Sequence, residues 1–313
     1  MWAHTEPATA LALFRIAIGI ILLHTVVDVW WTEVEAWVWV DRTDGGVIKI
    51  FKGHWLVKML GGAGLETTHT LMGIVAAASL LMIAGLGHRV AAFVGLQALL
   101  ALLSMNPLSG GAHDKLLTNA LWLLLLAPAS ETLSLWCRWK RKRWTSARPV
   151  AAWPRYLVIL QITMTYCFTG LQKLGPSWMP WGDFSAIYYS LLTPTWARWD
   201  LVWIAWVFPL TQFGTILTWW WEVTWPVVLL ALWFRRTHGQ PGRVRALFNR
   251  VDVRSIYLLI GVGVHLVIEV ALNVGPFSWV SLAFYFCCFH PDEFKRYSER
   301  LRRRGGRAPG LLS

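Results

Sequence analysis

The sequence predicts an all-α fold, a polytopic integral membrane bundle of about eight transmembrane helices. Of its 313 residues, 56% are hydrophobic and only 15% are charged, whereas a soluble domain carries about 25% charged residues. Apolar stretches of the roughly 20 residues that cross a bilayer recur along the whole chain. Many of the 23 tryptophans lie at the edges of these stretches, where aromatic side chains meet membrane interfaces. These observations exclude a chain that folds in water alone.

The first four spans follow from the apolar runs of the N-terminal half. The first run is long enough to cross a bilayer despite its few ionisable residues. The tripeptide Gly87-His88-Arg89 separates the next two runs as a tight turn, and the fourth run ends where a dense basic segment begins. The predicted spans of this half are Thr9–Trp31, Thr68–Leu86, Val90–Met105 and Leu116–Trp136.

The second half supplies four more spans. The apolar run from 200 to 234 is too long for one crossing, so its start is predicted to be an interfacial helix rich in Trp. Pro226 should kink the crossing that follows, and Gly275-Pro276 separates the last two runs. The predicted elements are Trp153–Leu174, the interfacial helix Trp196–Val207, and the spans Leu210–Phe234, Ser255–Val274 and Phe277–Phe289.

The basic residues predict the orientation. They gather in three clusters, at 138–155, 235–254 and 295–307, and basic loops beside spans usually face the cytoplasm. Both termini are then cytoplasmic, with a transmembrane domain over 1–290 and a basic cytoplasmic tail over 291–313. We expect this tail to be disordered or bound to anionic headgroups. The net charge of +12 therefore indicates a lipid bilayer as the partner, and not a nucleic acid.

Ionisable residues inside the spans are candidates for function, because a charge there costs about 2.5–3.5 kcal/mol. Arg15, near the start of the first span, is either part of a structural ion pair or snorkels to the interface. Glu222 lies in the middle of a span and must be protonated, paired or facing a cavity. Lys173 closes a long apolar helix on the outer side, where it is either a snorkelling lysine or a desolvated base.

Histidines complete this set. His113 lies in the loop before the fourth span, where it is either solvated or at the mouth of a cavity. His265 and Glu269 are four residues apart on one helix face. Two ligands do not make a zinc site, and the four cysteines show no metal-binding spacing. We therefore predict no metal, and expect buried polar packing or proton handling in a cavity open to the outside.

Four motifs, read in order over roughly 10–290, resemble the HTTM (horizontally transferred transmembrane) domain family. This domain is the membrane portion of vitamin K-dependent gamma-glutamyl carboxylase and of its bacterial relatives. The most specific motif runs from Tyr166 through Gly170 and Lys173 to Trp178 and Gly182. The others are Leu13-Phe14-Arg15-Ile16-Ala17-Ile18-Gly19, Gly111-Ala112-His113, and Val264-His265-Leu266 with Gly275, Phe277 and Leu282-Ala283.

The resemblance implies a function. In that family the lysine that matches Lys173 is the base that deprotonates reduced vitamin K, which then reacts with oxygen so that glutamate can be carboxylated. By resemblance, a reduced vitamin K or menaquinone-type quinol is the expected cofactor. His113 and His265 join Lys173 as catalytic candidates, and the cavity is expected to include Arg15, Tyr166, Trp178, Glu222 and Glu269. The family's paired lysines are Gln172-Lys173 here, so one candidate base is left.

Two functions stay open at this point. The first is a carboxylase-like or oxidoreductase enzyme that uses a quinol in a cavity facing away from the cytoplasm. The second is a noncatalytic accessory protein that acts in the maturation or export of a secreted peptide, with that peptide or a separate extracytoplasmic subunit as partner. In both cases we expect a multi-pass protein of a bacterial inner (cytoplasmic) membrane.

Overall fold

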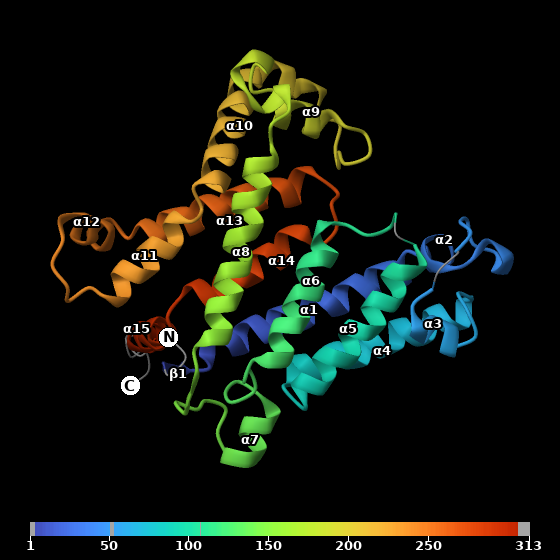
Figure 1. The fold of residues 1–313 in the computed structure, drawn as a ribbon, viewed down its shortest axis with the longest axis horizontal. Coiled ribbons are helices and arrows are strands. Elements are labelled where there is room, and N and C mark those ends of the chain that lie inside the picture. The colour runs from blue at the N-terminus through green and yellow to red at the C-terminus, as the bar shows by residue number, and fades with distance from the viewer. Residues whose placement is uncertain (1–3, 51–52, 107, 306–313) are drawn as a thin grey trace, which may run out of the picture. The chain divides into compact units, whose positions relative to one another are not determined.

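The computed structural model describes residues 4–50, 53–106 and 108–305, and most of them are helical (Figure 1). The all-α fold predicted from the sequence is confirmed; the two strands among the described residues are three residues long each. The chain divides into two compact units, one formed by 1–157 with 286–313 and the other by 158–285.

The first unit begins with a short strand and ends with a helix. Its β1 pairs antiparallel with β2, with Glu6 opposite Val150. Its elements are β1 (Thr5–Pro7), α1 (Thr9–Trp31), α2 (Glu35–Trp39), α3 (Trp55–Met59), α4 (Leu65–Ala84), α5 (His88–Met105), α6 (Ala112–Leu126), α7 (Leu135–Arg141), β2 (Pro149–Ala151) and α15 (Pro291–Gly305), with the start of α8 (Trp153–Gln172).

The core of the first unit lies where α1, α4, α5 and α6 pack in sequence order. The buried side chains of α1 recur at helical spacing: Leu11, Phe14, Ile18 and Leu22 are at most 1% exposed. A Cβ atom on Gly19 would lie only 2.8 Å from Cγ1 of Ile83. Small residues allow such close helix contacts inside membranes, so α1 and α4 are packed tightly here.

The turn between α4 and α5 depends on glycine. Gly85 ends α4 with φ of 69° and Gly87 begins α5 with φ of 53°, both in the left-handed region. Glycine adopts this region without the strain that a Cβ atom causes. The predicted hairpin is therefore confirmed, but its turn lies at 85–87, and His88 and Arg89 already belong to α5.

The fourth predicted span was too long. In the structure α6 covers Ala112–Leu126, and the chain then leaves the helix until α7 begins at Leu135. Ala127 is extended, with ψ of 143°. The cause is Pro128, which disfavours the helical conformation of the residue before it and cannot donate a backbone hydrogen bond.

The second unit contains the remaining helices. It includes α8 from residue 158 onward, and a one-turn 3₁₀ helix at Pro176–Trp178 follows it. The other elements are α9 (Ala186–Leu192), α10 (Phe208–Val223), α11 (Val227–Arg236), α12 (Arg243–Val251), α13 (Val253–Ala271) and α14 (Phe277–Tyr285). α13 and α14 form the predicted hairpin around Gly275, which has φ of 61°.

Pro226 breaks the helix instead of kinking it. α10 ends at Val223 and α11 begins at Val227, so the predicted single crossing Leu210–Phe234 is two helices. Before α10, the predicted interfacial helix Trp196–Val207 is a 3₁₀ helix over Val202–Val207 that continues directly into α10. The proline lacks the N–H that a continuous helix needs at this position.

Within the described residues, five helical segments are long and apolar enough to cross a membrane. They are Thr9–Trp31, Leu65–Ala84, His88–Met105, Val202–Val223 and Val253–Ala271. These spans define an integral membrane protein. The count of eight crossings stays a prediction, because three of the predicted crossings, which correspond to α6, α8 and α14, are not among these five.

Residues 291–305 of the basic tail are helical and not disordered, and the prediction for 306–313 lies outside the described residues. α15 runs over Pro291–Gly305. Glu293 accepts a hydrogen bond at 2.8 Å from the backbone N–H of His290, the residue before this helix. A carboxylate three residues into a helix that bonds back to the first N–H is one half of a capping box, so α15 has a defined start.

Candidate polar site in the second unit

One face of α8 carries the candidate site. Tyr166, Gly170 and Lys173 are four and three residues apart, so they lie on one side of the helix and of its last turn. A Cβ atom on Gly170 would come within 2.8 Å of the backbone nitrogen of Val223 and 2.9 Å of Cβ of Glu222. α8 thus approaches the end of α10 closely, and this approach places Lys173 next to Glu222.

Lys173 and Glu222 form an ion pair. The ammonium Nζ of Lys173 donates to Oε2 of Glu222 at 2.5 Å. The two side chains are 19% and 9% exposed. Nζ also lies 4.3 Å from the ring centre of Trp178, within the range of a cation–π interaction. The sequence left three states open for Glu222, namely protonated, paired or facing a cavity. In the structure Glu222 is paired with Lys173.

A second polar pair lies deeper on the same face of α8. The hydroxyl of Tyr166 is hydrogen-bonded to Nε2 of His265 at 2.6 Å, and it lies 3.2 Å from the hydroxyl of Tyr285. His265 is 1% exposed. Because His265 bonds to Tyr166 from another helix, its predicted neighbour Glu269 is not its hydrogen-bonding partner.

Two tryptophans enclose this pair. The rings of Trp221 and Trp225 are centred 4.7 and 4.6 Å from the ring of Tyr166. The indole N–H of Trp221 donates to the carbonyl oxygen of Tyr257 at 2.9 Å, which fixes its orientation. Both indoles are at most 1% exposed. The Tyr166 hydroxyl therefore lies in an aromatic, water-poor environment.

Several buried polar atoms here lack a partner within the part of the chain that the structure describes. They are Nδ1 of His265, Nε1 of Trp225 and Oε2 of Glu269. A buried polar atom without a hydrogen bond costs about 1–3 kcal/mol. In a native structure such atoms call for an explanation, and an absent polar ligand is one.

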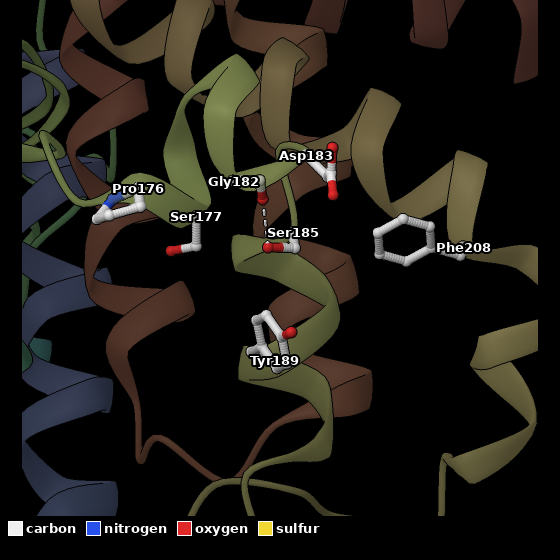
Figure 2. A pocket seen from close by; sticks show the side chains of 7 residues that line it. All are labelled: Pro176, Ser177, Gly182, Asp183, Ser185, Tyr189 and Phe208. Atoms are coloured by element: carbon white, nitrogen blue, oxygen red, sulfur yellow. Dashed lines mark hydrogen bonds between the residues drawn. The ribbon is translucent and has the colours of Figure 1, made fainter.

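An open pocket of about 320 Å³ begins beside this site. Figure 2 shows the side chains that line it, with the hydroxyl of Ser185 donating to the carbonyl oxygen of Gly182 at 2.7 Å. The lining is Pro176, Ser177, Gly182, Asp183, Ser185, Tyr189 and Phe208. Pro176 and Ser177 share the short 3₁₀ helix with Trp178, whose ring contacts Lys173.

Two of the predicted site residues belong to the first unit. Arg15 is 0% exposed and donates to the carbonyl oxygens of Ala129 and Leu133 at 2.9 and 2.6 Å, and to the hydroxyl of Ser130 at 3.0 Å. These acceptors are not the carboxylate that an ion pair requires, and the buried guanidinium does not snorkel. Arg15 therefore ties α1 to the segment after α6.

His113 also lies in the first unit, in the first turn of α6. Its Nε2 is 3.4 Å from Oδ2 of Asp114. The same carboxylate oxygen accepts a hydrogen bond from the backbone N–H of Gly111 at 2.7 Å. Asp114 therefore caps α6 and holds the imidazole of His113 at the helix start.

The candidate site residues predicted from the sequence do not include Trp221, Trp225 or Tyr285. The sequence contains an indication for Trp221, because this residue directly precedes Glu222 in a run of three tryptophans. Tyr285 ends α14, far along the chain from Tyr166. No local spacing indicates that these two hydroxyl groups meet.

The fold and this site define a class: an integral membrane helical protein with paired acid–base side chains buried among its helices. The chain belongs to the HTTM domain family, whose profile matches residues 3–238. No curated protein and no solved structure is significantly similar to it. The HTTM domain is the membrane part of the vitamin K-dependent carboxylase family, so the chain carries a carboxylase-type membrane domain. Tyr166, Lys173 and Glu222 lie inside the matched range; His265 lies beyond it.

Proposed function

We propose that this protein is a carboxylase-like membrane enzyme that binds a reduced quinone and uses Lys173 as its base. The observation that carries the proposal is the Lys173–Glu222 contact at 2.5 Å, in which the acid and the base are 9% and 19% exposed. A carboxylate this close to an ammonium group is able to take its proton. The transfer leaves a neutral amine and a neutral acid, and no net charge changes.

The residues around this pair fit a quinol. Its ring requires an apolar, aromatic environment and its two hydroxyls require polar partners, as in most small-molecule sites. Tyr189 and Phe208 line the pocket, and its lining residue Ser177 directly precedes Trp178, whose ring contacts Lys173. A quinol of the vitamin K or menaquinone class would supply the reducing equivalents and an acidic hydroxyl.

The chain's own groups would then handle protons at stated atoms. Nζ of Lys173, once neutral, would accept a hydroxyl proton, while Oε2 of Glu222 holds the proton it received. If Tyr166 donates to Nε2 of His265, the imidazole carries its own proton on the unpartnered Nδ1. His265 and Tyr166 would stabilise charge near the ligand, and Glu269 would act at the edge of the cavity.

Quinone retention tests the proposal directly. Protein purified in mild detergent would be extracted and its quinones measured by mass spectrometry, for wild type, Lys173→Ala and the control Lys58→Ala. We expect quinone in the wild type and the control, and loss from Lys173→Ala. Equal quinone in all three, or none in the wild type, would contradict the proposal.

One observation favours a second function. Lys173 and Glu222 neutralise each other, and a closed ion pair also serves as a structural clamp. The protein would then be a noncatalytic partner in the maturation or export of a secreted peptide. In that case replacing both residues together, with Lys173→Met and Glu222→Leu, leaves the cellular function intact, whereas an enzyme that needs the base loses it.

A further inference from the structure

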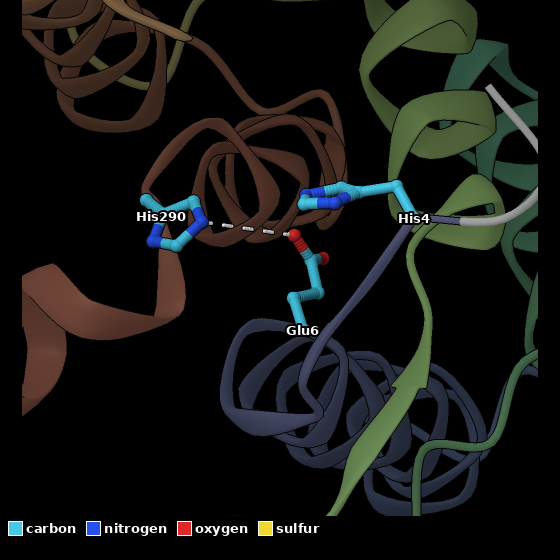
Figure 3. Close-up of side chains that lie close together, drawn as sticks. All are labelled: His4, Glu6 and His290. Carbon is cyan, nitrogen blue, oxygen red and sulfur yellow. Dashed lines mark ion pairs between the residues drawn. The ribbon is translucent and has the colours of Figure 1, made fainter.

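A cluster of three potential metal ligands lies in the first unit, whereas the site described above belongs to the second. His4, Glu6 and His290 each offer one ligand atom, and these atoms all lie within 4.8 Å of one another. Figure 3 shows the two imidazole rings on either side of the Glu6 carboxylate. Nε2 of His290 is 4.0 Å from Oε2 of Glu6.

Local structure holds each ligand in place. His4 and Glu6 are two residues apart in an extended segment, so their side chains lie on the same face. β1 pairs with β2, and the backbone N–H of Ala152 donates to the carbonyl oxygen of His4 at 3.0 Å. On the other side, His290 immediately precedes α15 and its backbone is bonded to Glu293. The cluster is thus formed by defined backbone positions.

The orientation of the His290 ring suits metal binding. Nδ1 lies 3.3 Å from Oδ2 of Asp292 and also 3.3 Å from the backbone nitrogen of Asp292, and Nε2 is directed at Glu6. A metal-bound histidine commonly has its other ring nitrogen next to a carboxylate, which orients the ring and raises its basicity. The side chain of His290 is 40% exposed, so an ion has access from solvent.

The local charges also favour a dication. The Glu6 carboxylate accepts hydrogen bonds from Nε and Nη2 of Arg155 at 2.6 and 2.9 Å. This guanidinium opposes a cation, but Glu6, Asp292 and Glu293 bring three carboxylates to the cluster. A carboxylate has about four lone-pair sites, so Glu6 keeps acceptor capacity beside Arg155.

We propose that His4, Glu6 and His290 bind one zinc ion, with a fourth position open to a ligand from solvent. Two imidazoles and one carboxylate form a known zinc ligand set, whereas calcium and magnesium prefer oxygen ligands. Bonds of about 2.0–2.1 Å in a tetrahedron place ligand atoms about 3.3 Å apart. Side-chain rotations that bring Oε2 of Glu6 and Nε2 of His290 closer by less than about 1 Å therefore reduce their 4.0 Å separation to the distance that zinc requires.

The bound ion would join β1 to the start of α15. These segments are at opposite ends of the described chain, and Arg155 already links Glu6 to the carbonyl oxygen of Cys287 at 2.8 Å. Zinc would add a second link at the same place. In this proposal the metal therefore links these two segments, and it does not depend on the quinol site.

Metal titration tests the site. Full-length protein without a polyhistidine tag would be stripped with EDTA, dialysed against Zn²⁺ or Co²⁺, and its metal content measured by mass spectrometry. We expect about one bound ion in the wild type and at least tenfold weaker binding in His4→Ala and His290→Ala. His238→Ala, which removes an exposed histidine of the second unit, is the matched control and should bind as the wild type does.

Two further readouts keep the test independent of folding. Bound Co²⁺ should give the visible absorption of a tetrahedral site in the wild type and in His238→Ala, and Zn²⁺ should raise the Tm of both. His290→Asn keeps a polar side chain before α15 and should lose the absorption while retaining its helical circular dichroism. Binding that survives in the His4→Ala/His290→Ala double variant, or no stoichiometric binding by the wild type, overturns the proposal.

Discussion

Lys173 and Glu222 are 49 positions apart in the chain, yet the ammonium group of one lies 2.5 Å from the carboxylate of the other. Both side chains are largely buried. Removing one partner of such a pair leaves an uncompensated charge, whereas replacing both with apolar groups is often neutral or stabilising. A comparison of single and double replacements therefore distinguishes a role of this ion pair in stability from a role in chemistry.

The first prediction follows from that asymmetry. Glu222→Gln should lower the free energy of unfolding by about 3 kcal/mol, because the Lys173 ammonium stays buried without its counter-charge. The double variant Lys173→Met/Glu222→Leu should recover most of the loss. Thermal and denaturant unfolding in detergent measure both. Equal destabilisation by the single and the double variant would show that the ion pair is not what the single variant disrupts.

Two glycines of α13 give a matched pair. A Cβ atom on Gly261 would collide with the hydroxyl of Tyr285 and lie 2.6 Å from Cζ2 of Trp221, whereas no atom lies within 4 Å of one on Gly263. Gly261→Ala should cost about 2 kcal/mol through overpacking. Gly263→Ala should be neutral or stabilise by up to about 1 kcal/mol, since alanine favours helix. Similar Tm values for the two variants would contradict the packing described here.

Arg15 should not tolerate lysine. The guanidinium reaches acceptors on Ala129, Ser130 and Leu133 at once, and the single nitrogen of lysine does not span them. Acceptors left without donors should cost Arg15→Lys about 2–3 kcal/mol. The exposed Arg89 supplies the control, since Arg89→Lys should leave the Tm unchanged. Unfolding curves that coincide for the two variants would argue that Arg15 does not tie α1 to the segment after α6.

Asp41 should make its loop sensitive to acid. Its carboxylate accepts hydrogen bonds from the backbone N–H groups of Thr43 and Ile50 at 2.9 and 2.5 Å, and these bonds lower its pKa. A lowered pKa in the folded state gives stability that is present above the unfolded value, about 3.9, and is lost as the pH falls through the folded pKa.

The variant Asp41→Asn tests this pH dependence. At neutral pH it should unfold at a lower temperature than the wild type, and the difference should shrink as the pH falls below the ordinary range of an aspartate. Parallel Tm measurements across acidic pH give the comparison. A difference that stays constant with pH would mean that the charge of Asp41 has no part in holding the loop.

The predicted orientation has its own test. Ser177→Cys lies in the loop that should face away from the cytoplasm, and Thr145→Cys lies in a basic segment that should face it. A membrane-impermeant thiol reagent applied to intact cells should label the first and not the second. Labelling of Thr145→Cys alone would reverse the topology. The buried cysteines 137, 287 and 288 should contribute little background.

Local patterns predicted the helices well where a long apolar run had clear ends. α1 has the predicted bounds, Thr9–Trp31, because the run is uninterrupted. The fourth span failed at Pro128, because the predicted run was extended through the mostly polar segment 129–134 to the apolar residues at 135–136. At Pro226 the expected kink is a complete interruption. Hydropathy measures how apolar a segment is, and it does not register the missing N–H of one proline.

The candidate site shows a different limit. The sequence indicates that Glu222 needs a partner, a proton or a cavity, because an unpaired charge is costly anywhere in the hydrocarbon region. It did not identify Lys173 as that partner, since the pairing depends on the close approach of α8 and α10 at Gly170. For the same reason the spacing of His265 and Glu269 on one helix face did not indicate that His265 bonds to Tyr166.

The interruption between α10 and α11 has a consequence for water in the bilayer. Breaking a helix leaves backbone N–H and C=O groups without their helical partners. Inside the hydrocarbon such groups draw in water unless other protein groups bond to them. Here the Thr224 hydroxyl donates to the carbonyl oxygen of Trp220 at 2.6 Å and accepts from the Tyr257 hydroxyl at 2.9 Å. The thiol of Cys167 lies 3.7 Å from the carbonyl oxygen of Val223. Side chains from α8, from α13 and from the turn itself thus bond to one another and to backbone carbonyls that the interruption frees.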